Sequence, residues 1–95
     1  MNDNDHSPKV SIYMTATCPY CIRAETLLRG KGVRVIETIR IDREPQRREE
    51  MIARSGRYTV PQVFIGADHV GGCDDLHALD DAGRLDRLLE SRSAA

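Results

Sequence analysis

Two cysteines separated by two residues are the most reactive feature of the sequence. Cys18-Pro19-Tyr20-Cys21 stands where an alternating apolar segment ends and a segment rich in helix formers begins. Pro19 suits the first position of a helix, which needs no backbone donor, so Cys18 becomes the N-cap residue. The free N–H groups of Tyr20 and Cys21 and the helix dipole would stabilise a negatively charged sulfur there. The spacing therefore predicts a nucleophilic Cys18 thiolate, with Cys21 as its resolving thiol.

Two other interpretations of this cysteine pair stay open. A C-x-x-C pair supplies half of a zinc site, but the other ligands would have to be Cys73, His69 or His77, and no second close pair exists. A structural disulfide would close only a tiny loop, and an odd total of three cysteines fits a disulfide-stapled scaffold poorly. A thiol redox site agrees best with the position between a strand and a helix.

A second motif, Thr59-Val60-Pro61, precedes a short apolar segment at residues 63–65. A proline just before a buried strand cannot donate to the sheet. A cis bond there would expose the backbone of Val60, which could pair with an extended peptide. The motif alone favours the simpler interpretation, an ordinary proline at the start of a strand.

A third motif, Gly71-Gly72-Cys73-Asp74-Asp75, leads into the last helical region. Its glycines permit close backbone approach, and the free N–H groups of Cys73 and Asp74 would form an anion site at a helix start. Asp74 or Asp75 would add a carboxylate able to hold an ammonium group. A glycine turn followed by acidic residues that favour the helix dipole is the alternative. We expect Cys73 itself to be a small packing group.

Hydrophobic periodicity, glycine and proline predict the elements that position these motifs. Strands are expected at residues 9–15, 33–41, 63–65 and 69–70, helices at residues 20–29 and 44–55, and one or two closing helices over residues 74–81 and 84–90. The order is β-α-β-α-β-β-α. It predicts an α/β protein with a four-stranded mixed sheet flanked by helices, in which the first two strands are parallel and the last two form a hairpin.

Length and composition exclude several classes of protein. A chain of 95 residues with a net charge of −1 lacks the basic excess of a general nucleic-acid or acidic-membrane binder. It also has no apolar run of the roughly 18 residues that a membrane helix needs. Residues 1–8 are expected to be a flexible tail without the features of a secretory signal, and residues 9–91 a single domain. We therefore expect a cytoplasmic protein, in a reducing compartment.

In this order and spacing, CPYC, TVPQVFIG and GGCDDL resemble the motifs of the dithiol glutaredoxins, notably the small bacterial type. The resemblance runs from about Val10 to Leu88. CPYC differs from the Trp-flanked CGPC of thioredoxins, and this chain contains no Trp. It also differs from the CGFS of monothiol glutaredoxins that carry iron–sulfur clusters. The resemblance implies a thioredoxin-like fold, glutathione as the co-substrate and no metal.

The resemblance also assigns the chemistry. Cys18 would attack the glutathione mixed disulfide of a substrate, Cys21 would resolve protein disulfides, and Tyr20 would line the groove beside the sulfur. The partners implied are glutathione and glutathionylated or disulfide-containing proteins, with ribonucleotide reductase or peroxidases as candidates. Neither nucleic acid nor a membrane is expected as a partner, and the protein is expected to be a monomer.

By the same resemblance, the other two motifs hold glutathione. Val60 would pair through its backbone with the cysteinyl part of glutathione beside a cis Pro61, and Thr59 would flank the same groove. The γ-glutamyl group would meet the start of the last helical region, at Gly72, Cys73, Asp74 and Asp75. An aspartate of this set would face the amine.

One position departs from the family pattern. Many glutaredoxins have a lysine three residues before the nucleophile, where it favours the thiolate and the glycyl carboxylate of glutathione, and here that residue is Thr15. Arg57 is the leading candidate to supply the missing charge. Arg23 and Arg40 are expected to be solvated surface side chains. We hypothesise weaker glutathione affinity, or a Cys18 thiol that ionises less readily than is usual for the family.

Overall fold

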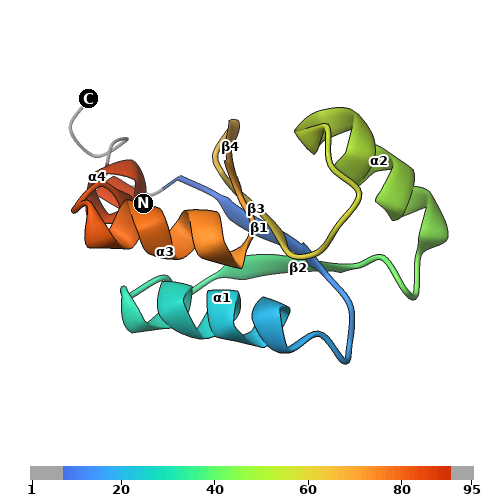
Figure 1. Cartoon of the computed structure of the whole chain (residues 1–95), viewed down its shortest axis with the longest axis horizontal. Helices are drawn as coiled ribbons and strands as arrows, with labels where there is room; N and C mark the ends of the chain where they lie inside the picture. Colours follow the sequence, from blue (N-terminus) through green and yellow to red (C-terminus); the bar gives the residue numbers. More distant parts are fainter. Residues whose placement is uncertain (1–7, 91–95) are drawn as a thin grey trace, which may run out of the picture.

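Four strands form one mixed sheet in the computed structural model, which describes residues 8–90 (Figure 1). The elements in chain order are β1 (Val10–Met14), α1 (Pro19–Gly30), β2 (Ile36–Arg40), α2 (Pro45–Ser55), β3 (Gln62–Ile65), β4 (Asp68–Gly71), α3 (Cys73–Asp81) and α4 (Leu85–Glu90). The strand order is β2-β1-β3-β4, with β1 and β2 parallel and the other two pairs antiparallel. The predicted element order, parallel first pair and hairpin are confirmed. Most of the expected tail, residues 1–7, and residue 91 lie outside the described residues.

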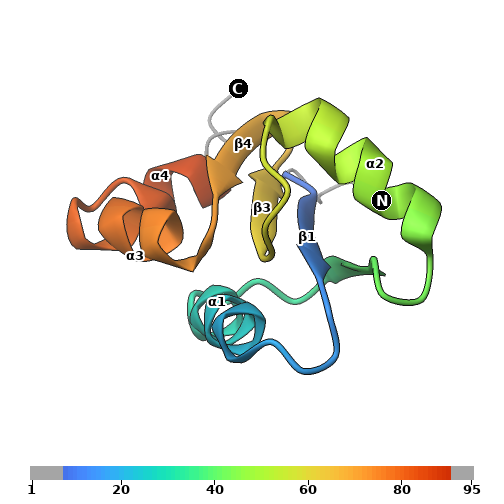
Figure 2. The ribbon, with the colours of Figure 1, turned by 45° about the vertical axis from the view of Figure 1, so that its right-hand side comes forward.

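Helices cover both faces of the sheet, as Figures 1 and 2 show. The α1 face comprises the buried residues Val10, Ile12, Met14, Cys21, Ala24, Leu28, Ile36, Val63, Ile65, Cys73, Leu76 and Leu85, which come from the sheet and from α1, α3 and α4. The α2 face comprises Tyr13, Ile39, Ile41, Met51 and Phe64. Successive residues of a strand point to opposite faces, so β1 contributes to both clusters and all five of its residues are buried.

Local sequence signals set most element ends. Pro19 begins α1, and Gly56 ends α2 with a left-handed backbone (φ +74°) while its N–H donates to the carbonyl of Ile52 at 2.8 Å. Glycine adopts this conformation without a steric penalty, which makes it a common residue after a helix. Apart from β2, each predicted element agrees with the structure to within one residue at either end.

The second strand, β2, is shorter than predicted. Residues 33–41 carry a β-branched alternation, but pairing with β1 runs only from Ile36 to Arg40. Val33 instead packs against the α1 face, and Val35 is 82% exposed. Because β1 itself has only five residues, it offers no further backbone partners, and residues 33–35 do not form a strand in spite of their β propensity.

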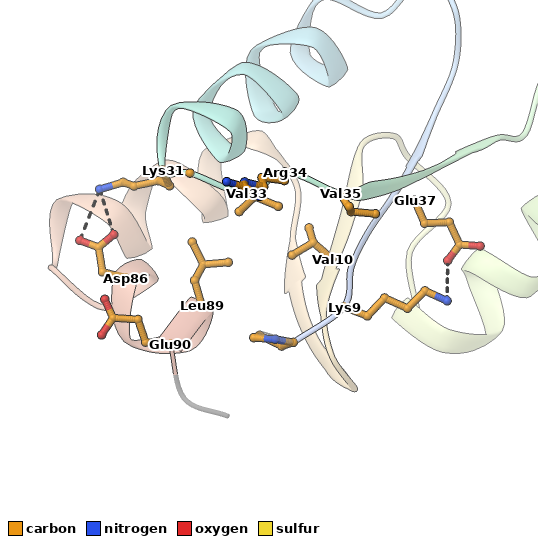
Figure 3. A pocket seen from close by; sticks show the side chains of 12 residues that line it. Lys9, Val10, Lys31, Val33, Arg34, Val35, Glu37, Asp86, Leu89 and Glu90 are labelled. Atoms are coloured by element: carbon orange, nitrogen blue, oxygen red, sulfur yellow. Dashed lines mark hydrogen bonds and ion pairs between the residues drawn. The ribbon is translucent and has the colours of Figure 1, made fainter. Parts of the chain in front are cut away.

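A cavity of about 900 Å³ opens between the start of β1, the segment before β2 and α4 (Figure 3). Two ion pairs lie at its edge: Lys9 with Glu37 at 3.1 Å and Lys31 with Asp86 at 3.3 Å. Lys31 caps the C-terminal end of α1, whereas Cys18 caps its N-terminal end. The cavity therefore lies at the far end of α1 from the cysteine pair, and no residue of the three motifs lines it.

Among the residues that the structure describes, no helix is both long and apolar enough to cross a membrane.

Candidate active site

Cys18 is the N-cap residue of α1, as its spacing to Pro19 predicts. Its backbone is extended (φ −95°, ψ 108°), and its Sγ accepts a hydrogen bond from the N–H of Cys21 at 3.2 Å. Of the two donors predicted for this sulfur, Cys21 makes the bond and Tyr20 does not. An N–H in the first turn has no carbonyl partner within the helix, so this donor is available to the sulfur. The hydrogen bond and the positive end of the helix dipole both favour a negative charge on Sγ.

Cys21 lies beneath Cys18 in the α1 face and has no exposed surface. All three cysteines of the chain are free thiols, so the pair is in its reduced state. Burial, followed by the hydrogen bond to Cys18, raises the pKa of Cys21 to about 12. The two thiols therefore differ in availability. Cys18 is half-buried at the surface, whereas Cys21 is a buried, protonated thiol.

The Thr59-Val60-Pro61 segment forms one wall beside the sulfur. The peptide bond between Val60 and Pro61 is cis, which confirms the expectation drawn from the family resemblance and overturns the simpler interpretation of the motif alone. The Sγ atom of Cys18 lies 4.0 Å from the carbonyl oxygen of Val60. Thr59 is exposed and Pro61 is buried, so this wall is packed into the protein at Pro61 and accessible to solvent at Thr59.

The start of α3 forms the second wall, with Gly72 as its N-cap residue. Gly71 has φ +117°, and a Cβ at that position would collide with the carboxylate of Asp75. A Cβ at Gly72 would approach the carbonyl oxygen of Pro61 to 3.4 Å. Glycine is therefore required at position 71, where the positive φ and the carboxylate of Asp75 leave no room for a Cβ, whereas a Cβ at Gly72 would make only ordinary van der Waals contact with the first wall. Cys73 is buried in the α1 face, as expected of a packing group.

Asp75 and Arg57 form a bridge between the two walls. The Oδ2 atom of Asp75 accepts hydrogen bonds from Arg57 Nη1 at 2.8 Å and from the N–H of Gly72 at 2.9 Å. These two donors hold the pKa of Asp75 below its usual range. We expected Arg57 to supply a free cation and Asp75 to be one of two candidates for an amine. In this structure each is the other's partner, and Asp74 is the exposed carboxylate at the helix start.

Arg40, one of the two other cations considered near Thr15, is also paired. It donates from Nε to Asp42 Oδ1 at 2.8 Å, and the second oxygen of Asp42 accepts from the N–H of Ala16 at 3.3 Å. The Arg40–Asp42 pair therefore anchors the loop between β1 and Cys18. Arg40 is a surface side chain, as expected, but it is paired with Asp42 rather than free.

Exposed aromatic residues lie next to the cysteine pair and to Thr59 in the chain. Tyr20 is 56% exposed and has the guanidinium of Arg23 at 5.9 Å from its ring centre. Tyr58, which directly precedes Thr59, is 70% exposed. The sequence pattern does not single out Tyr58, because exposure cannot be inferred from residue type. Gln62 carries a detectable signal, since it is a polar residue that begins the otherwise apolar strand Gln-Val-Phe-Ile.

The zinc interpretation finds no ligand set in the part of the chain that the structure describes. No group of three or more His, Cys, Asp or Glu side chains among residues 8–90 is arranged to hold a metal ion. Of the histidines considered, His69 lies in β4 and His77 in α3.

Comparisons with known proteins agree with the geometry. The family model described as Glutaredoxin matches residues 10–70. Glutaredoxin 3 of Escherichia coli (strain K12) is 60% identical over 81 residues, which cover 85% of this chain and 96% of that protein. The solution structure of the glutaredoxin from Brucella melitensis has a TM-score of 0.80 and 49% identity, covering 94% of this chain and 96% of that chain.

A third comparison concerns glutathione. The crystal structure of a buckwheat glutaredoxin–glutathione complex has a TM-score of 0.82 and 32% identity, covering 94% of this chain and 83% of that chain. Glutaredoxins as a family use glutathione. The fold, the reduced cysteine pair at the start of α1 and these relatives together show that the chain belongs to the glutaredoxin family, as a thiol–disulfide oxidoreductase of the small bacterial dithiol type.

Proposed function

We propose that this chain reduces glutathione mixed disulfides and protein disulfides, with Cys18 as nucleophile, Cys21 as resolving thiol and glutathione as co-substrate. The observation that carries the proposal is the contrast between the two thiols. Cys18 Sγ is partly accessible and receives a helix N–H at 3.2 Å. Cys21 is fully buried, and its raised pKa keeps it protonated while Cys18 reacts.

For a glutathionylated protein, the Cys18 thiolate attacks the glutathionyl sulfur. A bond forms between Cys18 Sγ and glutathione, the original S–S bond breaks, and the protein thiolate leaves and takes a proton from solvent. The thiolate of a second glutathione then attacks the sulfur of the bound glutathione. Glutathione disulfide leaves, and Cys18 is restored as the thiolate.

For a protein disulfide, Cys18 first forms a mixed disulfide with one substrate sulfur, and the other substrate sulfur leaves as a thiolate. Two of the causes that raise the pKa of Cys21 are the hydrogen bond and the charge of Cys18. Both disappear once Cys18 is a neutral disulfide, so the pKa of Cys21 falls when its attack is needed. Cys21 then gives up its proton and bonds to Cys18 Sγ, which releases the substrate. Two glutathiones reduce the resulting Cys18–Cys21 disulfide.

Glutathione occupies the groove between the two walls in this proposal. The backbone of Val60, beside the sulfur, pairs with its cysteinyl part, and the free N–H groups at the start of α3 attract its γ-glutamyl carboxylate. Asp74, exposed and at the same helix start, accepts the ammonium group. The residues assigned to the groove are Tyr20, Arg57, Thr59, Val60, Pro61, Gly72, Cys73, Asp74 and Asp75.

The substrates proposed are glutathionylated and disulfide-containing proteins of the cytoplasm, with ribonucleotide reductase and peroxidases as candidates. The small net charge supports neither nucleic acid nor an acidic membrane as a partner. We propose that the protein acts as a monomer.

A coupled assay tests the proposal. It contains a glutathione mixed disulfide of a small thiol, glutathione, NADPH and glutathione reductase, and it compares wild type with Cys18→Ser, Cys21→Ser and Cys73→Ser. We expect turnover by wild type, Cys21→Ser and Cys73→Ser and none by Cys18→Ser. With a protein disulfide as substrate, Cys21→Ser should lose activity as well.

The contrary outcome is equally defined. If wild type fails with glutathione but accepts electrons from a thioredoxin reductase, then the groove does not use glutathione. If Cys18→Ser retains turnover while Cys21→Ser loses it, the two thiols have been assigned the wrong roles.

A further inference from the structure

A buried amide lies directly behind the wall that flanks Cys18. Gln62 is only 1% exposed, although it begins a strand whose other residues are apolar. Its Nε2 donates to the carbonyl oxygen of Thr59 at 2.9 Å and lies 3.4 Å from the hydroxyl oxygen of the same residue. Burying an amide is unfavourable unless its polar atoms find partners. The position of Gln62 therefore depends on these contacts, and so does the backbone of Thr59.

The orientation of this amide is fixed by its partners. The carbonyl of Thr59 can only accept a hydrogen bond, so the NH₂ end of Gln62 must face it. The Oε1 end then faces Nε2 of His69 at 2.7 Å, and that nitrogen must be the donor. One chain of hydrogen bonds thus runs from His69 through Gln62 to Thr59.

Several contacts hold the imidazole of His69 in this role. Its ring packs on Phe64, with 5.0 Å between ring centres. Burial, then the nearby positive charge of Arg57, lowers the pKa of His69 below its ordinary value. A neutral ring with its proton on Nε2 provides the donor that Gln62 requires.

We propose that Gln62 and His69 are positioning residues for glutathione, acting through the Thr59–Val60 backbone. Thr59 is exposed, yet its carbonyl is tied to a buried amide, and the next residue places its own carbonyl oxygen 4.0 Å from Cys18 Sγ. Holding this edge in one conformation before binding reduces the conformational entropy that binding would otherwise cost. The inference deepens the proposed function and rests on it, since it concerns how the same groove recognises the glutathionyl group.

Two substitutions remove this chain of hydrogen bonds at different points. Gln62→Met keeps a side chain of similar length without donor or acceptor, and His69→Phe keeps the ring contact with Phe64 but loses the donor. We expect each to raise KM for the glutathione mixed disulfide, by about three- to tenfold, which is the range of one lost hydrogen bond. The value of kcat should stay within about twofold of wild type, because the first turn of α1 is untouched.

Three readouts separate positioning from general destabilisation. The rate of alkylation of Cys18 by iodoacetamide, measured in a Cys21→Ser, Cys73→Ser background, should be unchanged. His69→Gln, whose amide N–H can take the place of Nε2–H, should restore KM toward the wild-type value. Because His69 acts through Gln62, the double variant Gln62→Met, His69→Phe should raise KM no further than Gln62→Met alone.

The matched controls are Gln46→Met, an exposed residue of α2, and His77→Phe in α3, and both should leave KM unchanged. If Gln62→Met fails to fold, His69→Phe and its rescue by His69→Gln carry the test. Three results would each overturn the inference. They are an unchanged KM in the folded variants, additive effects on KM in the double variant, and alkylation of Cys18 that becomes slower as KM rises. If wild type itself does not turn over the mixed disulfide, the proposed function has failed and the inference fails with it.

Discussion

The two faces of the sheet are held to their helices by different forces. On the α1 face, twelve buried side chains from the sheet and three helices pack together, all of them nonpolar or cysteine. On the α2 face, the helix contributes one buried residue, Met51. Polar contacts complete that face. Arg54 lies 4.0 Å from the ring centre of Phe64 and donates to the hydroxyl of Tyr13 at 2.8 Å, and this hydroxyl donates to Glu50.

The residues of the candidate site are held by both kinds of interaction. Cys18 and Cys21 belong to α1, which is held by burial of apolar surface, an interaction without directional requirements. Thr59 lies on the loop that leaves α2, and its carbonyl is held by a hydrogen bond from Gln62, whereas the next residue, Val60, packs against both faces. The comparison implies that stability depends chiefly on the α1 face. The conformation of Thr59, beside the proposed glutathione site, depends more on directional contacts.

Leu28→Ala gives the largest effect that we expect. Leu28 is fully buried in the middle of the α1 face, and its truncation leaves a cavity that costs about 2–5 kcal/mol of unfolding free energy. Urea denaturation measures it. Ile22→Ala, on the exposed side of the same helix, should cost about 0.5 kcal/mol or less. Equal costs for the two variants would remove the basis for the comparison.

Tyr13→Phe tests the other face. The ring of Tyr13 is fully buried, but its hydroxyl connects Arg54 with Glu50. Removing the hydroxyl should cost about 1–2 kcal/mol, less than Leu28→Ala, because the packing of the ring is preserved and both charged partners can turn to water. Tyr58→Phe is the control, since Tyr58 is 70% exposed. A loss as large as that of Leu28→Ala would mean that the polar contacts stabilise as strongly as the apolar core.

A pH titration separates the two faces without changing the core. The hydrogen bond from Tyr13, followed by contacts with Arg47, lowers the pKa of Glu50 from its ordinary value. A lowered folded-state pKa contributes stability above the unfolded pKa, and this stability is lost as pH falls through the folded value. The fall in Tm between pH 6 and pH 3 should therefore be smaller in Glu50→Gln than in wild type.

The matched control for this titration is Glu49→Gln, an exposed neighbour on the same helix, which should keep the wild-type fall in Tm. The effect at Glu50 is modest, because its side chain is 39% exposed and solvent screens its ion pairs. A Glu50→Gln variant whose Tm falls with acid as steeply as wild type would show that this network does not make the α2 face acid-sensitive.

Features that depend on neighbours in the sequence could be predicted. Pro19 after Cys18 fixes the start of α1, and the two-residue spacing alone brings the cysteines together, so the proposed nucleophile and resolving thiol depend on local geometry. The end of α2 at Gly56 is equally local. The length of β2 could not be predicted, because it depends on the five residues of β1 with which it pairs.

Contacts between distant side chains lay beyond the sequence pattern. Arg57 and Asp75 are separated by 18 positions, and each alone has the chemistry to bind glutathione. Nothing in the pattern indicates that they bind each other. The cis bond before Pro61 needed the family resemblance, since a proline before a strand is usually trans. Gln62 is a mismatch in its strand, but its partner His69 becomes apparent only when β3 and β4 are paired.

Thr15→Lys gives the smallest effect and addresses the loop between β1 and Cys18. Two arginines considered as replacements for the missing lysine already form ion pairs, Arg57 with Asp75 and Arg40 with Asp42. A lysine at this position would add a free cation for the glycyl carboxylate of glutathione. Since an exposed ion pair contributes at most about 1 kcal/mol, KM for the mixed disulfide should fall by about two- to fivefold, and the unfolding free energy should hardly change. The coupled assay measures KM, with Thr26→Lys as a control that adds the same charge on the exposed side of α1. KM and the pH dependence of Cys18 alkylation could both stay at their wild-type values. In that case the paired arginines already interact with glutathione, and the Arg57–Asp75 ion pair is one of the contacts that bind it.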